Sequence, residues 1–456
     1  MTKKIQTLRF WKIQLYKLIT LLSMPLLLAV AVAVLPLLTI GKLIAQLILI
    51  KKGEMLHLLG FYLKRLFGLS VISFWQNSSG LKKWLGTPLF FLRETFKRVC
   101  GLLVGNDFIA SITNNAELLF GKRITTSVRL TALAKLYLHL LTAPIQIALS
   151  YPRRIIGAFL YSIILPAGYF TIPSFQPSAL QPSKKYFLPN YLDGTSIETH
   201  EIISQSQDRK APTSYIIRLQ GNGGTIHRED SDETRTYYEK TRANIIFYNP
   251  RGVQQSSGLA TSAWDIVSDG ITQVKALLAR GVKDITLDGH SLGGATATLV
   301  AEYFQQRGIT IKVYNDRSFY KIGAFFLYPR GGAFTPDDKR KTDATFIGVW
   351  LRSILRWTQC EMHAGRAALS LKPEAIAVAV TPKDNVIPHC TSMYSYLAHH
   401  STADVRAKRD MVIQTPFLLH YPYLLGSTVA HNVCKSTYPD ENAAHFIDFH
   451  ARSIPQ

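Results

Sequence analysis

The first 190 residues of this 456-residue chain almost lack acidic side chains. They carry 4 Asp and Glu against 23 Lys and Arg, so they account for +19 of the formal net charge of +22. Residues 191–456 are nearly neutral, at +3. The charge is therefore concentrated in a front region that is also strongly apolar, whereas the back region has the composition of an ordinary globular domain.

Cysteine is also scarce: Cys100, Cys360, Cys390 and Cys434 stand far apart in the sequence. There is no C-x-x-C pair and no histidine cluster at metal-ligand spacing, so the sequence predicts neither a disulfide framework nor a zinc site. We expect buried thiols, no metal and no cofactor. Such cysteine usage is typical of a reducing compartment, and we expect the back region to lie in the cytosol.

Charged residues are missing altogether from Leu18 to Gly41, a run of 24 residues. About 20 apolar residues suffice for a helix to span a bilayer, and two prolines inside this run suit a re-entrant hairpin equally well. Farther along, apolar residues alternate with Lys and Arg, as in helices that lie in a membrane interface. We expect residues 1–190 to form a helical membrane-associating region. A soluble helical domain with a solvated basic face is the alternative.

Residues 171–198 contain four prolines and several serines, a composition that cannot continue a helix. The change in charge balance falls in the same stretch. We therefore expect a linker from about residue 171 and a domain boundary at residue 190. The prediction is two units, the membrane-associating region 1–190 and a globular domain 191–456.

After this linker, short β-branched runs alternate with segments of helical spacing. The expected strands are residues 213–220, 243–249, 283–289, 311–315, 374–380 and 410–415, and helical spacing is clear at 264–280 and 293–308. This alternation predicts the α/β class, with a mostly parallel central sheet and helices on both faces. In such sheets the functional residues lie beyond the carboxyl ends of the strands.

The sequence GHSLGG at 289–294 stands between an expected strand and an expected helix. Its residues Gly289, His290, Ser291 and Gly293 fit the pattern G-x-S-x-G of a nucleophile turn in the context that this turn requires. Small residues are needed two positions before and two after the serine because its backbone is strained and its neighbours press close. A tight glycine-rich turn without chemistry is the plain alternative. The pattern predicts Ser291 as a nucleophile.

A serine hydroxyl becomes nucleophilic when a histidine takes its proton and a carboxylate orients that histidine. In α/β enzymes with this turn, the acid and then the histidine follow the serine along the chain. Asp384 comes directly after the expected strand 374–380, where a catalytic acid would lie, although an aspartate there can also form a turn. Asp316 is the rival acid, and the adjacent Arg317 offers it an ion pair instead.

Four histidines follow the last expected strand. His431 lies in a loop between that strand and a final helical segment, a position that suits a general base. His420 is closer to the strand end and stays open as the second choice. His445 and His450 fall inside the helical segment, where a packing or surface role is expected.

The reaction also needs N–H donors for the negative charge that develops on the carbonyl oxygen. One expected donor is the backbone N–H of Leu292, directly after the serine. The glycine-rich run 221–224 follows the strand 213–220, and a loop there can turn its N–H groups toward the site. From this run we predict Asn222 as the second donor. A merely flexible turn is the alternative.

Taken together, five motifs resemble the α/β-hydrolase superfamily across about residues 195–456: Q-G-N-G-G at 220–224, N-P-R-G-V-Q-Q-S-S-G at 249–258, G-H-S-L-G-G at 289–294, K-D-N-V-I-P at 383–388 and H-N at 431–432. They look like membrane-associated serine hydrolases with a G-N-x-G oxyanion loop, a group that usually has His where this chain has Gln220. The resemblance implies an α/β-hydrolase fold.

The stretch Y-N-D-R-S-F at 314–319, together with the apolar basic front region, also resembles lipase-type effectors that intracellular bacterial pathogens inject into host cells, the SidB group among them. This second resemblance implies type IV secretion and a host membrane as the destination.

The sequence thus predicts a membrane-associated serine hydrolase that cleaves carboxylic esters or thioesters through an acyl-enzyme. A membrane-bound front region places a lipid or an acylated protein beside the enzyme as substrate. A lid is expected within residues 338–372. We expect no nucleic-acid partner, because the basic residues of the front region are embedded in apolar sequence. The alternative is a scaffold or membrane anchor whose hydrolase fold has lost its chemistry.

Overall fold

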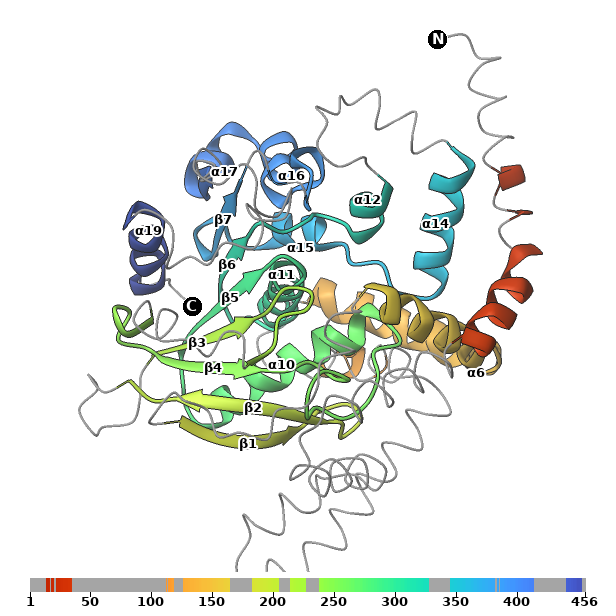
Figure 1. Ribbon diagram of the computed structural model, residues 1–456, viewed down its shortest axis with the longest axis horizontal. Coiled ribbons are helices and arrows are strands. Elements are labelled where there is room, and N and C mark those ends of the chain that lie inside the picture. The colour runs from red at the N-terminus through yellow and green to blue at the C-terminus, as the bar shows by residue number, and fades with distance from the viewer. Residues whose placement is uncertain are drawn as a thin grey trace, which may run out of the picture.

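The centre of the molecule is an eight-stranded sheet with the order β1-β2-β4-β3-β5-β6-β7-β8 (Figure 1). The computed structural model describes residues 14–16, 18–19, 22–34, 112, 114–118, 126–164, 183–204, 214–226, 238–327, 345–381, 384, 386–413 and 440–452. The strands are β1 (Ser183–Pro189), β2 (Ser196–Ile202), β3 (Ser214–Leu219), β4 (Asn244–Tyr248), β5 (Asp284–His290), β6 (Lys312–Asp316), β7 (Ile376–Val380) and β8 (Asp410–Ile413).

Six strands, β3 to β8, run parallel to one another, and β2 lies antiparallel between β1 and β4. Each of these six lies within two residues of a strand expected from the sequence, so the mostly parallel sheet is confirmed. A sheet of this order with a serine turn directly after its fifth strand is the arrangement of the α/β-hydrolase fold.

The first two strands lie inside or next to the stretch that we expected to be a linker. All seven residues of β2 are buried, including Glu198, His200 and Glu201. Polar side chains satisfy the two carboxylates: Lys185 lies 2.9 Å from Glu198, and Arg280 lies 2.7 Å from Glu201. The proline-rich linker is therefore shorter than expected on its carboxyl side, and the domain boundary near residue 190 stays a prediction.

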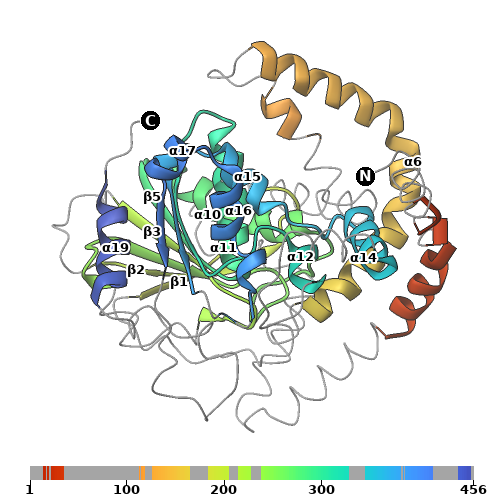
Figure 2. The same cartoon turned by 90° about the horizontal axis from the view of Figure 1, so that it is seen from above.

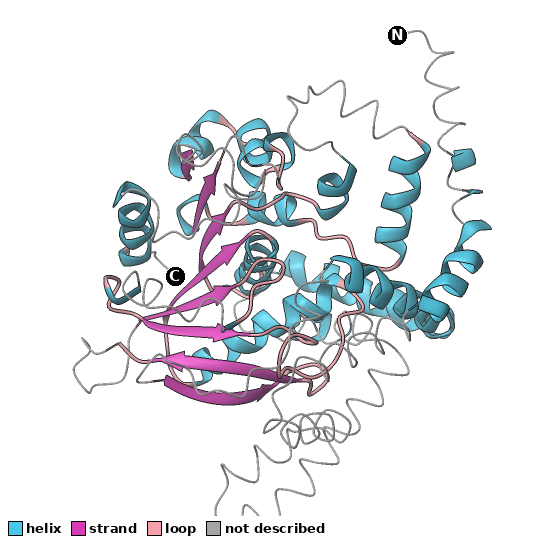
Figure 3. Cartoon of the chain, viewed as in Figure 1, coloured by secondary structure: helices cyan, strands magenta, loops and turns pink. Residues whose placement is uncertain are grey.

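Helices cover both faces of the sheet (Figures 1 and 3). They are α6 (Thr126–Ile164), α10 (Ala263–Ala279), α11 (Leu292–Gln305), α12 (Ile322–Leu327), α14 (Phe346–Trp357), α15 (Ala364–Ser370), α16 (Met393–His400), α17 (Ala403–Lys408) and α19 (Asp440–Ala451), with short 3₁₀ turns at η2 (Pro373–Ala375) and η3 (His389–Thr391). α10, α11 and α15 pack on one face, and Phe446 and Phe449 of α19 pack on the other. Because both faces are covered, the parallel strands are largely buried, and even the polar side chains of β5 and β6, such as Asp288 and Asn315, are fully buried.

The described parts of the front region pack onto this domain (Figure 2). Residues 22–34 form a helix, and its Met24 and Leu27 belong to a cluster with Ile156 of α6 and Ile354 of α14. Farther along α6, Tyr161 is 1% exposed and lies within the main core. Among the residues that the structure describes, no helix is both long and apolar enough to cross a bilayer.

A buried charge cluster fixes the loop that follows β4. The Arg251 guanidinium lies 2.9 Å from Asp193, 3.0 Å from Asp265 and 2.8 Å from Asp269, and all four side chains are almost completely buried. Burial raises the pKa of Asp269 even though the adjacent Arg251 opposes the shift. Such a cluster is weak evidence for stability, but removing its only guanidinium would leave buried carboxylates without compensation. It therefore holds the β4 loop in one position beside the site.

Candidate active site

The candidate nucleophile Ser291 connects β5 to α11 with no intervening residue. Its backbone has φ 53° and ψ −118°, a conformation that L-residues rarely adopt and that costs on the order of 1–3 kcal/mol. The side chain is 7% exposed. A non-glycine residue keeps such strain only where the surrounding structure enforces it, and such residues cluster at functional sites.

Glycines beside Ser291 are required by packing. A Cβ atom at Gly289 would lie 2.5 Å from the carbonyl oxygen of Gly293. A Cβ atom at Gly293 would lie 2.0 Å from the carbonyl oxygen of Leu219. The neighbouring atoms are backbone and cannot move aside. The glycines of the G-x-S-x-G pattern are therefore explained by close approach of backbone to backbone, as the sequence predicted.

The carboxyl ends of β5, β6 and β7 meet at one edge of the sheet, which we call the carboxyl edge. The Ser291 N–H donates to the Asp316 carbonyl over 2.9 Å, and the Arg317 N–H donates to the Ala379 carbonyl over 2.9 Å. These two bonds extend the parallel pairing by one residue beyond the strands. All three predicted residues lie at this edge, since Ser291 follows β5, Asp316 is the last residue of β6 and Asp384 follows β7.

The rival acid Asp316 forms the ion pair that its neighbour suggested. Arg317 Nε donates to Oδ1 over 2.9 Å, and Nη2 donates to Oδ2 over 2.8 Å. Both side chains are buried, at 0% and 2% exposure for Asp316 and Arg317. Because both carboxylate oxygens engage the guanidinium, Asp316 is a poor candidate for orienting a histidine.

The preferred acid Asp384 lies four residues beyond the end of β7 and is 4% exposed. Its Oδ1 accepts the backbone N–H groups of Val386 and Ile387, each over 2.8 Å. The turn-forming role that we considered as an alternative is thus observed, and it also fixes the orientation of the carboxylate. A role as the catalytic acid stays a prediction.

Both predicted bases, His431 and His420, lie outside the described residues. The other two candidate histidines, His445 and His450, both lie on α19. His450 Nε2 is 2.9 Å from Ser214 Oγ at the first residue of β3, and its Nδ1 is 2.8 Å from Thr286 Oγ1. His445 packs on the Tyr314 ring, with centroids 5.7 Å apart. Both have the packing role that was expected from their helical position.

The predicted oxyanion donors come from two neighbouring segments. Leu292 is the first residue of α11, where backbone N–H groups have no acceptor within the helix. The loop after β3 turns at 221–224, closed by a 3.0 Å bond from the Gly224 N–H to the Gly221 carbonyl. Asn222 is exposed at the tip of this turn. Its role as the second donor stays a prediction.

Gly221, just before Asn222, places this turn directly against the nucleophile. A Cβ atom at Gly221 would lie 2.8 Å from His290 Nδ1 and 3.3 Å from the Ser291 Cβ. No larger residue fits at this position without moving the ring of His290. The glycine-rich loop therefore approaches the site closely, which a flexible surface turn would not need to do.

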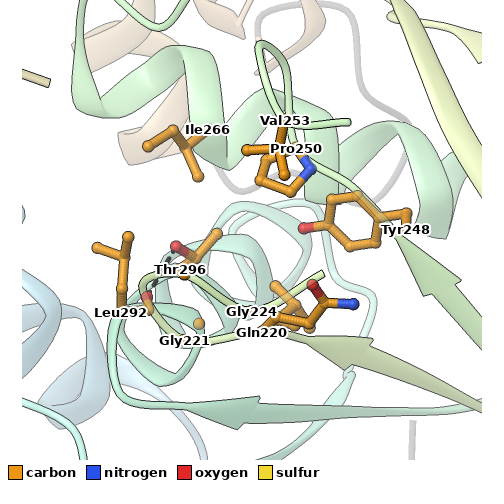
Figure 4. A pocket seen from close by; sticks show the side chains of 12 residues that line it. Gln220, Gly221, Gly224, Tyr248, Pro250, Val253, Ile266, Leu292 and Thr296 are labelled. Atoms are coloured by element: carbon orange, nitrogen blue, oxygen red, sulfur yellow. Dashed lines mark hydrogen bonds between the residues drawn. The ribbon is translucent and has the colours of Figure 1, made fainter. Parts of the chain in front are cut away.

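A small cavity lies beside these elements (Figure 4). Its volume is about 30 Å³, and it is bounded by the loop after β3, the end of β4 with its loop, α10 and the first turn of α11. Most of the wall is apolar, with Val253, Ile266 and Leu292 among the lining residues. The cavity could not be predicted from the sequence because its walls come from four separate segments. Among the described residues, no group of three or more His, Cys, Asp and Glu is arranged to hold a metal ion.

A known protein family matches the part of the chain that contains the candidate nucleophile. The sequence profile of the family described as Lipase (class 3) matches residues 229–319, which contain β4, α10, β5, the Ser291 turn, α11 and β6. No curated protein matches the chain. The family match supports a hydrolase of the lipase and esterase type.

Several solved structures are similar over longer stretches. The esterase Pf2001 of Pyrococcus furiosus has 15% identity and a TM-score of 0.41, covering 61% of this chain and 96% of that one. An alpha-beta hydrolase of Vibrio vulnificus has 16% identity and a TM-score of 0.40, covering 57% and 85%. Brefeldin A esterase, described as a bacterial homologue of human hormone sensitive lipase, has 16% identity and a TM-score of 0.40, covering 66% and 85%. These values are low, so we rest the fold on strand order and turn geometry.

Proposed function

We propose that the chain is a membrane-associated serine hydrolase that cleaves carboxylic esters or thioesters. The observation that carries this proposal is the strained backbone of Ser291, held between β5 and α11 by glycines packed against backbone. A scaffold without chemistry has no need to maintain this strain. The family match across the same turn supports the same chemistry.

In the proposed reaction, Ser291 Oγ attacks the carbonyl carbon while His431 takes its proton, and Asp384 orients the histidine. The backbone N–H groups of Leu292 and Asn222 hold the oxyanion. The carbon–oxygen or carbon–sulfur bond of the substrate then breaks, and the histidine returns the proton to the leaving alcohol or thiol. Water cleaves the acyl-enzyme by the same steps. His420 is the alternative base.

A fluorophosphonate probe tests this proposal, because such probes label only activated serines. We expect labelling of the wild-type protein and its complete loss in Ser291→Ala. Cys390→Ala, which removes a partly buried thiol outside the turn 289–294, is the matched control and should label normally. A well-folded wild-type protein that takes no label would support the scaffold instead.

Membrane association is proposed from the surface of the described front region. Exposed large apolar side chains gather on the helix 22–34 and on the first half of α6. They include Leu22, Leu26, Leu130, Tyr137 and Leu141, which are 61–70% exposed. Soluble monomers rarely leave this much apolar surface uncovered. Anionic lipid would also attract the basic residues of this region. A lipid or acylated protein is the proposed substrate class.

Flotation with vesicles that contain anionic phospholipid tests the membrane surface. Leu22→Ser with Leu26→Ser should reduce the bound fraction of the full chain severalfold, because two side chains that are each 70% exposed lose their apolar contact. Ile203→Ser is the control, since Ile203 is 45% exposed at the end of β2, away from both helices. Equal binding by all three proteins would contradict the proposed surface.

Delivery into a host cell is proposed from the sequence resemblance to injected lipase-type effectors. A fusion to a reporter that gives signal only in the host cytosol tests it. We expect signal that depends on a working type IV secretion system. Signal that persists without that system, or that never arises, would reject this part of the proposal.

A further inference from the structure

Gln220, between β3 and the glycine turn, carries a buried carboxamide with unmet hydrogen bonds. The residue is 8% exposed, and within the described part of the chain neither Oε1 nor Nε2 has a hydrogen-bond partner. Leaving a buried amide unsatisfied is unfavourable, and native proteins have few such groups. The position therefore suits a group that meets its partner only when a ligand is bound.

The Gln220 side chain lies in the cavity beside the nucleophile turn (Figure 4). The turn closes over it, since a Cβ atom at Gly224 would lie 2.7 Å from the Gln220 Cβ. Gly221, the next residue, approaches the Ser291 Cβ, and Leu292 directly follows the serine. The cavity is therefore lined by the residues on either side of the nucleophile turn, Gly221 and Leu292, and a group bound there lies next to this turn.

One part of the cavity wall is polar and the rest is apolar. Figure 4 shows the hydroxyl of Tyr248 and the carboxamide of Gln220 on the same side of the space, across from Ile266 and Leu292. Burial, and then the charge of Asp269, raises the pKa of Tyr248, so its hydroxyl stays protonated. The cavity thus matches a short apolar chain that bears a group able both to donate and to accept a hydrogen bond.

The acyl part of the substrate suits this cavity better than the alcohol part. The alcohol must leave before water can attack, so it needs an open path out of the site. The acyl group stays attached to Ser291 throughout the intermediate and can occupy a closed space. A volume of about 30 Å³ admits only a small group beyond the existing walls.

On the basis of the proposed function, we propose that Gln220 determines specificity by hydrogen-bonding a polar substituent, such as a hydroxyl, on a short acyl chain. An acyl group without this substituent leaves the buried carboxamide unpaired and is cleaved more slowly. The substrate class that the cavity selects is therefore the hydroxyacyl esters and thioesters.

The test compares p-nitrophenyl 3-hydroxybutyrate with p-nitrophenyl butyrate as substrates of the full chain. We expect the wild-type kcat/KM to favour the hydroxylated ester by about tenfold or more, the range set by one unmet buried hydrogen bond. Gln220→Met keeps the length of the side chain and removes its polar atoms. In this variant the ratio should fall to about one, because kcat/KM should drop more for the hydroxylated ester than for butyrate.

Gln273→Met is the matched control. Gln273 is also fully buried and its Oε1 also lacks a partner among the described residues, but it lies on α10 facing Thr199 of β2 and not in the cavity. This variant should keep the wild-type ratio. A wild-type ratio near one would overturn the inference by itself, even if Gln220→Met does not fold.

Two further outcomes are decisive. An unchanged ratio in folded Gln220→Met would overturn the inference, and if kcat/KM fell equally for both esters, Gln220 would only support the turn. A wild-type protein that cleaves neither ester and takes no fluorophosphonate would refute the proposed function and, with it, this inference. A wild-type protein that takes the label but cleaves both esters with equal kcat/KM would refute the inference alone.

Discussion

A serine lies at each of the two edges of the central sheet, and the two serines differ in backbone conformation. At the carboxyl edge, the Ser291 backbone has φ 53°. The glycines on either side of it, Gly289 and Gly293, pack so closely against backbone that neither position has space for a side chain. At the opposite edge, where the parallel strands begin and which we call the amino edge, Ser214 is the first residue of β3 and hydrogen-bonds His450 over 2.9 Å. A serine beside a histidine is therefore present where no chemistry is expected. Backbone strain, and not the presence of a Ser–His contact, distinguishes the candidate site.

The largest expected effect is on ester hydrolysis, which should depend on the serine at the carboxyl edge and not on the histidine at the amino edge. Ser291→Ala should lower ester hydrolysis by about 10⁴-fold or more with little change in the free energy of unfolding. His450→Ala should do the reverse, because it removes two buried hydrogen bonds far from the carboxyl edge. Steady-state kinetics and urea unfolding of both variants check this. If His450→Ala abolished activity while keeping full stability, the comparison would fail.

A second prediction concerns the loop beside the carboxyl edge. Arg251→Met should destabilise the protein by about 3–5 kcal/mol, because three buried carboxylates lose their guanidinium. Arg452→Met is the control. Its partner Asp410 is partly exposed, so a change of about 0–1 kcal/mol is expected. Urea unfolding measures both, and equal losses would show that burial of the Arg251 cluster has no special weight.

The third prediction uses pH to probe the amino edge. Burial, aided by nearby Lys312, lowers the pKa of His450 from 6.5 to about 4. Between these two values the unfolded chain binds a proton that the folded chain does not, so stability falls as pH falls through this window. By pH 5 the loss from this residue is on the order of 2 kcal/mol.

In His450→Gln, the decline in melting temperature between pH 7 and pH 5 should therefore be smaller than in the wild-type protein. His400, an exposed histidine on α16, supplies the control variant His400→Gln, which should keep the wild-type slope. Identical slopes in all three proteins would mean that His450 does not sense the buried environment.

The smallest expected effect comes from relieving strain at the carboxyl edge. Ser291→Gly removes the Cβ that makes φ 53° unfavourable, so it should stabilise the protein by about 1 kcal/mol while abolishing activity. Ser318→Gly at a buried position without positive φ is the control and should destabilise it. A fall in stability of Ser291→Gly as large as that of Ser318→Gly would argue that Ser291 is unstrained.

The six parallel strands and the Ser291 turn could be predicted because hydrophobic runs and turn residues are local signals. β2 could not, since SIETHEI looks like an exposed segment. The buried carboxylate of its Glu201 is satisfied by Arg280 and Tyr215, 79 and 14 residues away in sequence, which each lie 2.7 Å from Oε1. Pairing of this kind exists only in the folded chain. The sequence gives no local indication of it.

The candidate site was predicted to a similar extent. The glycines of the Ser291 turn could be predicted from the sequence, and so could the Asp316–Arg317 ion pair that the structure contains. Gln220 and the glycine turn after it also stood out in the sequence. The sequence could not show that the Gln220 carboxamide is buried without a partner, since this depends on Tyr248 and α11 closing the cavity. The choice between His431 and His420 stays a prediction.

The bond between Ser23 Oγ and Trp350 Nε1 joins positions 327 residues apart. During synthesis, at roughly 5–20 residues per second, the helix 22–34 emerges tens of seconds before α14 does. During that interval the catalytic domain is not folded, so the apolar surface of this helix cannot pack against it. Whatever meets the nascent chain first, whether a chaperone, a secretion apparatus or a lipid surface, therefore competes with the enzyme's own later segments for this helix.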